Sequence, residues 1–140
     1  MNLNIKLLAD HCKPEITDTA NGGIDLRSRD TVQISPMSFR TVRLGITTEF
    51  PPEYVGLLFD RSGIAANTGL FKTAGVIDSN YRGEWSVILH NQTRTAQTFK
   101  AGERCCQVVF VERPAVTIAI VDSLNESVRG DGGFGSSGVE

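Results

Sequence analysis

The sequence predicts an all-β fold, and three observations support this prediction. Short stretches rich in β-branched and aromatic residues recur along the chain of 140 residues, and such residues favour strands. Clusters of glycine, proline and asparagine separate these stretches and mark turns. Only SGIAANTGL (62–70) could form a helix, of about two turns. Many short strands separated by turns are typical of a β-sandwich or β-barrel, and the length suits one domain.

The expected strands can be followed from the N-terminus. Leu3, Ile5 and Leu7 alternate with polar residues, which predicts a strand with one buried face. Further strands are expected at 31–35, 39–50, 54–60, 84–91, 105–112 and 116–122. Ser62 is the expected N-cap of the short helix, because a serine hydroxyl can accept a hydrogen bond from the first helical turn.

The last part of the chain differs in composition from the rest. Between Asn125 and Arg129 the strand pattern gives way to RGDGGFGSSG (129–138). We therefore expect a β-barrel domain over 1–128 and a glycine-rich C-terminal arm over 129–140, flexible without a ligand. The arm matches G-x-G-x-x-G, but a dinucleotide-binding motif must follow a strand and open a helix, which is not expected here.

The composition argues against several classes of protein. The net charge is -2, so no general attraction to DNA or to an anionic membrane is expected. No apolar run reaches the roughly 20 residues that span a bilayer, and the N-terminus lacks the apolar core of a secretion signal. The three cysteines make a poor disulfide framework. We therefore expect an intracellular protein that is not secreted, in the cytoplasm or, in a eukaryotic or viral setting, the nucleus.

The arm also has the chemistry of an anion-binding segment. Glycines let backbone N–H groups approach a phosphate closely, and the hydroxyls of Ser136 and Ser137 add donors. The Arg129 guanidinium suits phosphate oxygens, and the Phe134 ring can lie against a flat base. The arm could therefore wrap a phosphate chain, although a simple disordered tail would have the same composition.

Four further clusters carry polar groups at turns or strand ends. They are ANGGIDLRS (20–28) with Asp25, DRSGIAA (60–66) with Arg61, Ser62 and Gly63, AGVIDSNYRGEW (74–85) with Asp78 and Tyr81, and AGERCCQVVF (101–110) with Gln107. Each alone is a weak signal. Together with the arm, and in this order, they resemble the five motifs of the trimeric dUTPase family, from Ala20 to Gly138.

The resemblance implies a fold, an assembly and a reaction. Members of this family form a distorted, jelly-roll-like β-barrel and assemble as homotrimers, in which each active site takes motifs from different subunits. They hydrolyse dUTP to dUMP and pyrophosphate with Mg²⁺, which keeps uracil out of DNA and supplies dUMP for thymidylate synthesis. We therefore expect dUTP as substrate, Mg²⁺ as cofactor and further copies of this chain as partners, with no direct binding to DNA or membranes.

The resemblance also implies catalytic roles for individual residues. Asp78 would be the general base that deprotonates the water attacking the α-phosphorus, since a carboxylate can accept that proton. Gln107 would hold this water or the α-phosphate. The Tyr81 ring would pack under the deoxyribose and leave no room for a ribose hydroxyl.

The remaining motif residues would bind the base and the phosphates. Uracil would pair with main-chain groups of a hairpin at 75–77, and bases with the wrong donor pattern would be rejected there. Phe134 would stack over the uracil. The residues implied in this binding are Gly75, Val76 and Ile77 for the base, with Arg61, Ser62, Gly63, Arg129, Gly135, Ser136 and Ser137 for the phosphates.

Mg²⁺ in this family is held mainly by the substrate phosphates and by water. Asp25 resembles the acidic residue of the first motif, which assists through water or by pairing with the Arg129 guanidinium. Two positions depart from the usual pattern: Asp60 adds a carboxylate next to the phosphate ligands, and Lys72 stands where some relatives have asparagine. The Asp60 carboxylate is unfavourable there unless it points away or pairs with a neighbouring cation.

Two other functions remain open at this point. A dCTP deaminase would share the fold, but it would need a glutamate on the strand after the third motif, where this sequence has Ile88. A non-catalytic regulatory relative would keep the β-barrel without the chemistry, but here Asp78, Tyr81 and Gln107 are all present. Hydrolysis of dUTP is therefore the expected function.

Overall fold

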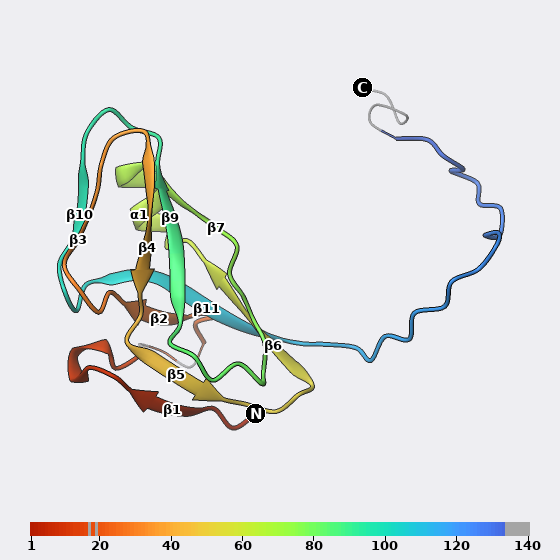
Figure 1. Ribbon diagram of the computed structural model, residues 1–140, viewed down its shortest axis with the longest axis horizontal. Helices are drawn as coiled ribbons and strands as arrows, with labels where there is room; N and C mark the ends of the chain where they lie inside the picture. Colours follow the sequence, from red (N-terminus) through yellow and green to blue (C-terminus); the bar gives the residue numbers. More distant parts are fainter. Residues whose placement is uncertain (17, 19, 134–140) are drawn as a thin grey trace.

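The structure, a computed structural model, describes residues 1–16, 18 and 20–133. Antiparallel strands dominate it and curve around a common core (Figure 1). The elements are β1 (Asn4–Leu7), η1 (Asp10–Cys12), β2 (Ile24–Arg27), β3 (Val32–Ile34), β4 (Ser38–Arg43), β5 (Ile46–Glu49), β6 (Tyr54–Phe59), α1 (Ser62–Thr68), β7 (Leu70–Thr73), β8 (Val76–Ile77), β9 (Ser86–Asn91), β10 (Gln97–Phe99) and β11 (Arg104–Glu112). The predicted all-β fold is confirmed.

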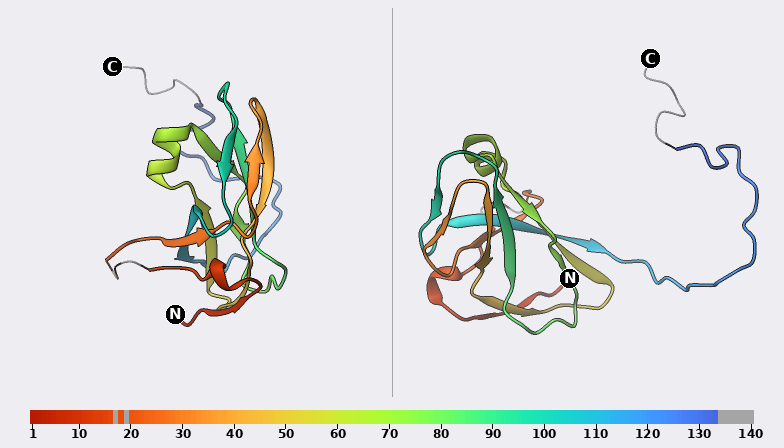
Figure 2. Two further views of the ribbon diagram at one scale, coloured as in Figure 1. Left: turned by 90° about the vertical axis from the view of Figure 1, so that its left-hand side faces the viewer. Right: turned by 45° about the horizontal axis from the view of Figure 1, so that its top comes forward.

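Within the described residues the strands form four small sheets, and every strand pair is antiparallel. The strand orders are β2-β11-β6-β8, β4-β9-β7, β1-β5 and β10-β3. Many neighbours in these sheets are distant in the sequence, as in a jelly roll. Figure 2 shows the strands wrapping around the body from two further directions.

The inward faces of the two larger sheets supply most of the core. Alternate residues of β9 point inward, so that Val87, Leu89 and Asn91 are buried. Trp85, just before β9, is 1% exposed, and its ring centroid lies 6.4 Å from that of Phe110 on β11. Alternating burial is the pattern of a sheet with one face in the core, which explains why the sequence of β9 predicts a strand.

The stretch 39–50, predicted as one strand, is two strands in the structure. Gly45 separates β4 from β5 with a φ of +64°, a left-handed conformation that favours glycine. A Cβ atom at Gly45 would lie 2.5 Å from the Cys12 Sγ atom, so a larger residue does not fit. The apolar pattern continues on both sides of this glycine, and the sequence therefore gives no sign that β4 and β5 join different sheets.

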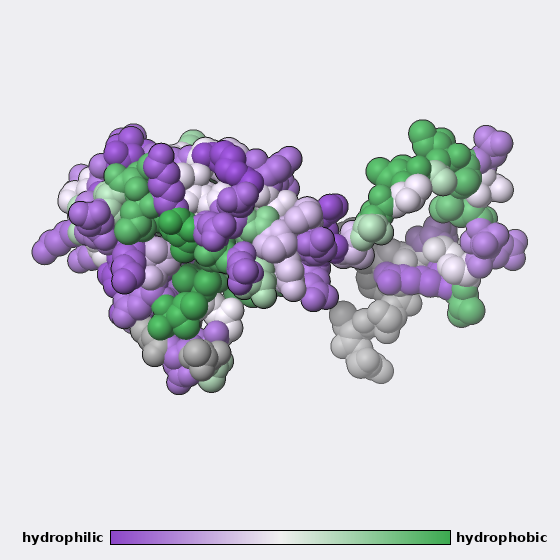
Figure 3. Space-filling model, turned by 90° about the horizontal axis from the view of Figure 1, so that it is seen from below, coloured by the Kyte–Doolittle hydropathy of each residue, from purple (hydrophilic) through white to green (hydrophobic). Residues whose placement is uncertain are grey.

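The strand predicted at 116–122 is wrong for the single chain. Within the described residues, 113–127 form no strand, and this segment runs away from the body after β11 (Figure 1). Its apolar side chains are exposed, with Ile118 at 87% and Ile120 at 98%, and Figure 3 shows apolar atoms gathered on the extended part. The sequence of this segment suits a strand, but the described chain offers it no partner.

Several smaller predictions are also corrected. Strands β2, β7, β8 and β10 are missed because each has at most four residues, too few for a periodic pattern. Arg61, not Ser62, is the N-cap of α1, and it makes no side-chain capping bond. No helix in the described part of the chain is both long and apolar enough to cross a bilayer.

The cysteines act as core residues. All three are buried with free thiols. Burial raises the pKa of the Cys12 thiol, and a hydrogen bond with Cys105, together with burial, raises the pKa of Cys106 well above its ordinary value. The thiols of Cys12 and Cys106 therefore stay protonated at neutral pH and pack like small apolar side chains.

Candidate active site

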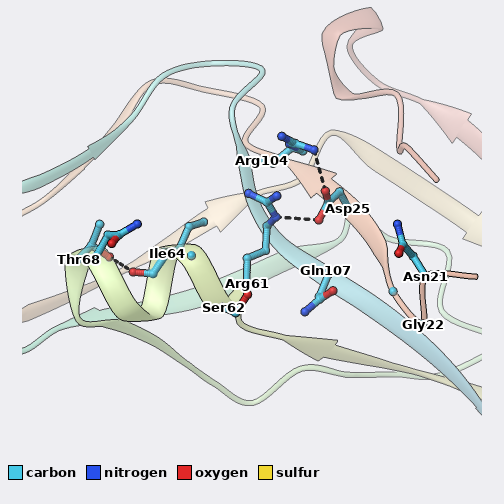
Figure 4. A pocket seen from close by; sticks show the side chains of 12 residues that line it. Asn21, Gly22, Asp25, Arg61, Ser62, Ile64, Thr68, Arg104 and Gln107 are labelled. Atoms are coloured by element: carbon cyan, nitrogen blue, oxygen red, sulfur yellow. Dashed lines mark hydrogen bonds and ion pairs between the residues drawn. The ribbon is translucent and has the colours of Figure 1, made fainter. Parts of the chain in front are cut away.

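A cavity of about 690 Å³, here called the first cavity, opens where β2, β11 and the start of α1 meet. It joins three of the clusters singled out in the sequence, 20–28, 60–66 and 101–110. Its lining residues are Asn21, Gly22, Gly23, Asp25, Arg61, Ser62, Gly63, Ile64, Asn67, Thr68, Arg104 and Gln107. The structure therefore brings together every residue predicted from those three clusters, and Figure 4 shows how Asp25, Arg61, Ser62 and Gln107 lie.

Asp25 links the two arginines of the first cavity. Its Oδ1 atom accepts a hydrogen bond from Arg61 Nε at 2.8 Å, and its Oδ2 atom accepts one from Arg104 Nη1 at 3.1 Å (Figure 4). The Asp25 side chain is only 16% exposed, so water screens these ion pairs less than pairs on an open surface. Two arginines against one aspartate give the lining a net positive charge, which suits an anion.

Arg104 is a cavity residue that sequence reasoning missed, and a β-bulge explains why. Residues alternate between the two faces of a regular strand, so positions 104 and 107 would point to opposite faces. The register of β11 against β2 shifts between Arg104 and Cys106, and Cys105 and Cys106 are both buried. The bulge lets Arg104 and Gln107 line the same cavity. The adjacent cysteines were the available signal, since a regular strand with only one face in the core does not bury two neighbours together.

Gln107 is held between two elements. Its Nε2 atom donates to the Asp60 carbonyl oxygen at 2.9 Å, and a Cβ atom at Gly23 would fall 2.4 Å from its Oε1 atom. A larger residue at position 23 would displace the Gln107 amide from this position. The Asp60 carboxylate accepts a hydrogen bond from the Lys72 backbone N–H at 2.8 Å. Asp60 does not line the first cavity, so its charge is turned toward β7.

The first turn of α1 supplies donors to the first cavity. Ser62 and Gly63 are the first two residues of the helix, and both line the cavity. Backbone N–H groups at the start of a helix have no acceptor inside the helix, so they are suited to an anion. Nothing lies within 4 Å of the place that a Cβ atom would take at Gly63, so the backbone of this residue is open on that side.

A second cavity, of about 260 Å³, lies beside β7, β8 and β9. It holds every residue predicted from the cluster at 74–85, including the exposed carboxylate of Asp78 and the Tyr81 ring. Its lining residues are Thr73, Ala74, Gly75, Val76, Ile77, Asp78, Tyr81, Glu84, Ser86 and Ile88. Ile88 therefore forms an apolar wall at the position where a deaminase would need a glutamate.

Asp78 and Tyr81 share one turn. The Tyr81 N–H donates to the Asp78 carbonyl oxygen at 3.1 Å. The guanidinium of Arg82 donates to the Ser79 carbonyl oxygen at 2.7 Å and to the Thr48 carbonyl oxygen at 3.3 Å, which ties the turn to β5. The Asp78 carboxylate and the Tyr81 ring therefore project from one turn, which these hydrogen bonds hold in place.

The hairpin expected at 75–77 is not formed. Val76 and Ile77 form β8, which pairs with β6. The strands next to β8 along the chain, β7 and β9, belong to another sheet. Gly75, just before β8, has a φ of +109°. Its carbonyl oxygen accepts a hydrogen bond from the Leu58 N–H of β6 at 2.8 Å. Lys72 Nζ donates to the Ala74 carbonyl oxygen at 2.9 Å, so the unusual lysine supports the backbone of the second cavity.

The arm takes no part in either cavity within the described residues. Arg129 Nε donates to the Gly132 carbonyl oxygen at 2.9 Å, on the segment that extends away from the body (Figure 1). Within the single chain Asp25 pairs with Arg61 and Arg104, and its pairing with Arg129 of another copy stays a prediction. The predicted residues Phe134, Gly135, Ser136 and Ser137 lie outside the described residues.

The first and second cavities have no lining residue in common. The sequence model of the dUTPase family matches residues 11–138. The chain belongs to the dUTPase family. The fold and the order of the motifs are those that the resemblance implied.

Individual relatives cover most of this chain. It is 40% identical over 124 residues to the deoxyuridine 5'-triphosphate nucleotidohydrolase of Anaeromyxobacter sp. (strain Fw109-5), which covers 87% of this chain and 84% of that protein. The enzyme of the same name from Escherichia phage T5 is 37% identical and covers 97% of this chain and 98% of its own. A solved structure of the Staphylococcus bacteriophage 80alpha dUTPase with dUPNHPP is similar with a TM-score of 0.90, at 28% identity and with 99% of each chain covered.

Proposed function

We propose that this protein is a dUTP diphosphatase, which hydrolyses dUTP to dUMP and pyrophosphate. The observation that carries the proposal is the division of chemistry between the two cavities. The first has two arginines and helix N–H groups for phosphates, and the second has an apolar wall, main-chain groups and a carboxylate. Relatives named deoxyuridine 5'-triphosphate nucleotidohydrolase match nearly the whole chain.

The second cavity suits the deoxyuridine part of the substrate. The main chain at 74–77 lies along it, and peptide groups can read the edge of uracil by hydrogen bonds that cytosine would leave unpaired. The Tyr81 ring closes the side next to Asp78, where it would press against C2′ of the sugar and exclude a ribose hydroxyl.

Asp78 is the proposed general base. It takes a proton from a water molecule while the water oxygen forms a bond to the α-phosphorus, and pyrophosphate leaves with the bridging oxygen. The carboxylate is exposed, so both water and substrate can reach it. Gln107 holds the water or an α-phosphate oxygen. Its amide can do so from a defined place, because Gly23 leaves room for it and the Asp60 carbonyl oxygen accepts a hydrogen bond from it.

The first cavity suits the phosphates. Arg61 is oriented by Asp25 through Nε, and within the described chain its terminal nitrogens have no protein acceptor and could meet phosphate oxygens. The N–H groups of Ser62 and Gly63 add neutral donors. Arg104 adds a second positive charge, and catalysis here is mainly positioning and neutralisation of charge.

Mg²⁺ fits this arrangement as an ion that arrives with the triphosphate. The described residues hold no group of three or more His, Cys, Asp or Glu that could cage a metal, and both Asp25 oxygens already accept arginine hydrogen bonds. Phosphate oxygens and water would therefore be the ligands, with Asp25 beyond them. When bound, the ion would neutralise the charge of the phosphates.

The division into two cavities also supports a homotrimer with shared sites. A complete site would need the second cavity of one copy to face the first cavity of another. The extended segment 113–128 would then pack its apolar side chains, such as Ile118 and Ile120, on a neighbouring copy, because such surface is unfavourable in water. We propose that 1–128 is the β-barrel domain and that 129–140 is an arm that closes over a neighbour's site.

The decisive experiment is the release of pyrophosphate from dUTP, dTTP, dCTP and UTP, with and without Mg²⁺. We expect rapid turnover of dUTP alone and a strong dependence on Mg²⁺. Release of ammonia from dCTP would instead indicate a deaminase, which Ile88 in the second cavity argues against. No turnover of any nucleotide would indicate a non-catalytic relative.

A further inference from the structure

Gly83 lies directly against the hydroxyl end of the Tyr81 ring. A Cβ atom at Gly83 would fall 2.3 Å from Tyr81 Oη, 2.5 Å from Cζ and 2.8 Å from Cε2. Carbon atoms of a folded protein do not approach this closely, so any larger residue would displace the ring. Gly83 is not among the glycines with a positive φ, so alanine could adopt its backbone conformation. The ring, and not the backbone, is what requires glycine here.

A second contact fixes the hydroxyl of Tyr81. It donates to the Glu84 carbonyl oxygen at 3.2 Å. The Glu84 carboxylate accepts the Gly45 N–H at 3.1 Å and Arg29 Nη1 at 3.0 Å, which holds this residue in place. The Tyr81 ring thus packs against Gly83, and its hydroxyl group is held by a hydrogen bond to the carbonyl oxygen of Glu84.

The rest of the ring belongs to the second cavity. Tyr81 is 45% exposed and lines that cavity together with Asp78. Because the two residues share one turn, the place of the ring defines the space left next to the carboxylate.

We propose that Gly83 is a positioning residue that sets the choice between deoxyribose and ribose by seating the Tyr81 ring. This inference rests on the proposed function, since it takes the ring to contact the sugar. With a Cβ atom at position 83, the ring loses both its seat and its hydrogen bond to Glu84. It then no longer forms a fixed wall against a 2′-hydroxyl group.

The seating itself can be tested without any activity. The protein has two tyrosines, Tyr54 and Tyr81, and the Tyr54 hydroxyl donates to Glu112 elsewhere in the fold. In protein carrying ¹³C-labelled tyrosine rings, Gly83→Ala should shift the NMR signals of Tyr81, assigned with Tyr81→Phe, and leave those of Tyr54. Unchanged Tyr81 signals in the folded variant would overturn the inference.

The effect on selectivity is tested by a double-mutant cycle. The measured quantity is the kcat/KM for dUTP divided by the kcat/KM for UTP. Gly83→Ala should lower this ratio by at least about tenfold. In the Tyr81→Ala background, adding Gly83→Ala should change the ratio by less than about twofold, because the clash is already gone. The double variant lacks the clash and stays measurable even if Gly83→Ala alone folds poorly.

The outcomes separate this inference from the proposed function. If the wild-type protein hydrolyses dUTP but Gly83→Ala keeps the ratio, or lowers it equally in both backgrounds, the inference fails alone. If the wild-type protein does not hydrolyse dUTP, the proposed function is wrong, and the proposed role of Gly83 in sugar selectivity is wrong as well. In that case the Tyr81 signals still decide whether Gly83 seats the ring.

Discussion

The Asp25 carboxylate orients the Arg61 guanidinium, with Oδ1 2.8 Å from Nε. This contact engages the inner nitrogen of the arginine and leaves its outer nitrogens for a ligand. Asp25 belongs to β2, whereas Arg61 follows β6, and β11 lies between these strands in the sheet. The pair therefore joins the two sides of the first cavity.

Replacing Asp25 by asparagine should weaken phosphate binding. The amide cannot hold two cations, and a hydrogen bond to a charged group contributes about 1.5–3 kcal/mol. We expect the kcat/KM for dUTP to fall about 10- to 100-fold. Asp30→Asn is the matched control, because Asp30 pairs with Arg43 at 2.8 Å on an exposed surface. Equal kinetics for the two variants would contradict the role of Asp25.

Gly23→Ala should disturb Gln107. The new Cβ atom would lie 2.4 Å from Oε1, so the amide must shift, which disturbs its hydrogen bond to the Asp60 carbonyl oxygen. We expect the kcat/KM for dUTP to fall by about tenfold or more. In a Gln107→Ala background the same substitution should cost little more. Additive losses in the double variant would mean that Gly23 acts by another route.

Asp78→Asn should abolish turnover and leave dUTP binding nearly intact. An amide cannot accept the proton of the attacking water, and a general base contributes about 10²- to 10⁴-fold to the rate. Single-turnover hydrolysis and equilibrium binding of dUTP measure the two effects separately. Asn80→Ala, at an exposed position on the same turn, should keep normal kcat. Equal losses of binding and turnover in Asp78→Asn would argue against a general base.

Ending the chain after Val128 should leave a folded trimer with strongly reduced activity. Of the residues removed, 129–133 are described, and they lie outside the body of the fold (Figure 1), whereas the apolar segment before them is kept. We expect an unchanged oligomeric mass by light scattering and a loss of kcat/KM of about 100-fold or more. Full activity of the shortened protein would refute the closing role of the arm.

The buried thiols should make the protein less stable at alkaline pH. The pKa values of Cys12 and Cys106 are raised above 9.0 by burial and, for Cys106, first by the hydrogen bond with Cys105. Below the ordinary thiol pKa both states keep their protons, and the stabilisation is complete. Above it the unfolded chain loses protons first, so the free energy of unfolding falls by up to about 1.4 kcal/mol per pH unit for each thiol.

This prediction is tested by denaturant unfolding under reducing conditions from pH 7 to pH 10. Cys106→Ala is the control, because it removes one of the two raised thiols and leaves the other titrating groups. Its free energy of unfolding should fall less steeply between about pH 8.5 and pH 10. Identical slopes for the two proteins would show that Cys106 does not contribute.

Parts of the fold that depend on local pattern agree with prediction. The strands at β6, β9 and β11 follow from β-branched and aromatic stretches bounded by turns. The division of 39–50 at Gly45 does not, because the contact with Cys12 that excludes a side chain comes from a distant part of the chain. The segment 116–122 has a strand pattern without a strand, since pairing needs a partner that the described chain lacks.

The amino-acid sequence was sufficient for the all-β class, the family and the residues of the motifs, because strand periodicity, turn residues and motif order are local properties of the chain. Which of these residues share a cavity was decided by the tertiary structure. Arg104 joins Gln107 through a bulge, and Gly83 seats the Tyr81 ring through a contact that no pattern encodes. Both depend on register and packing, which exist only once the strands have come together.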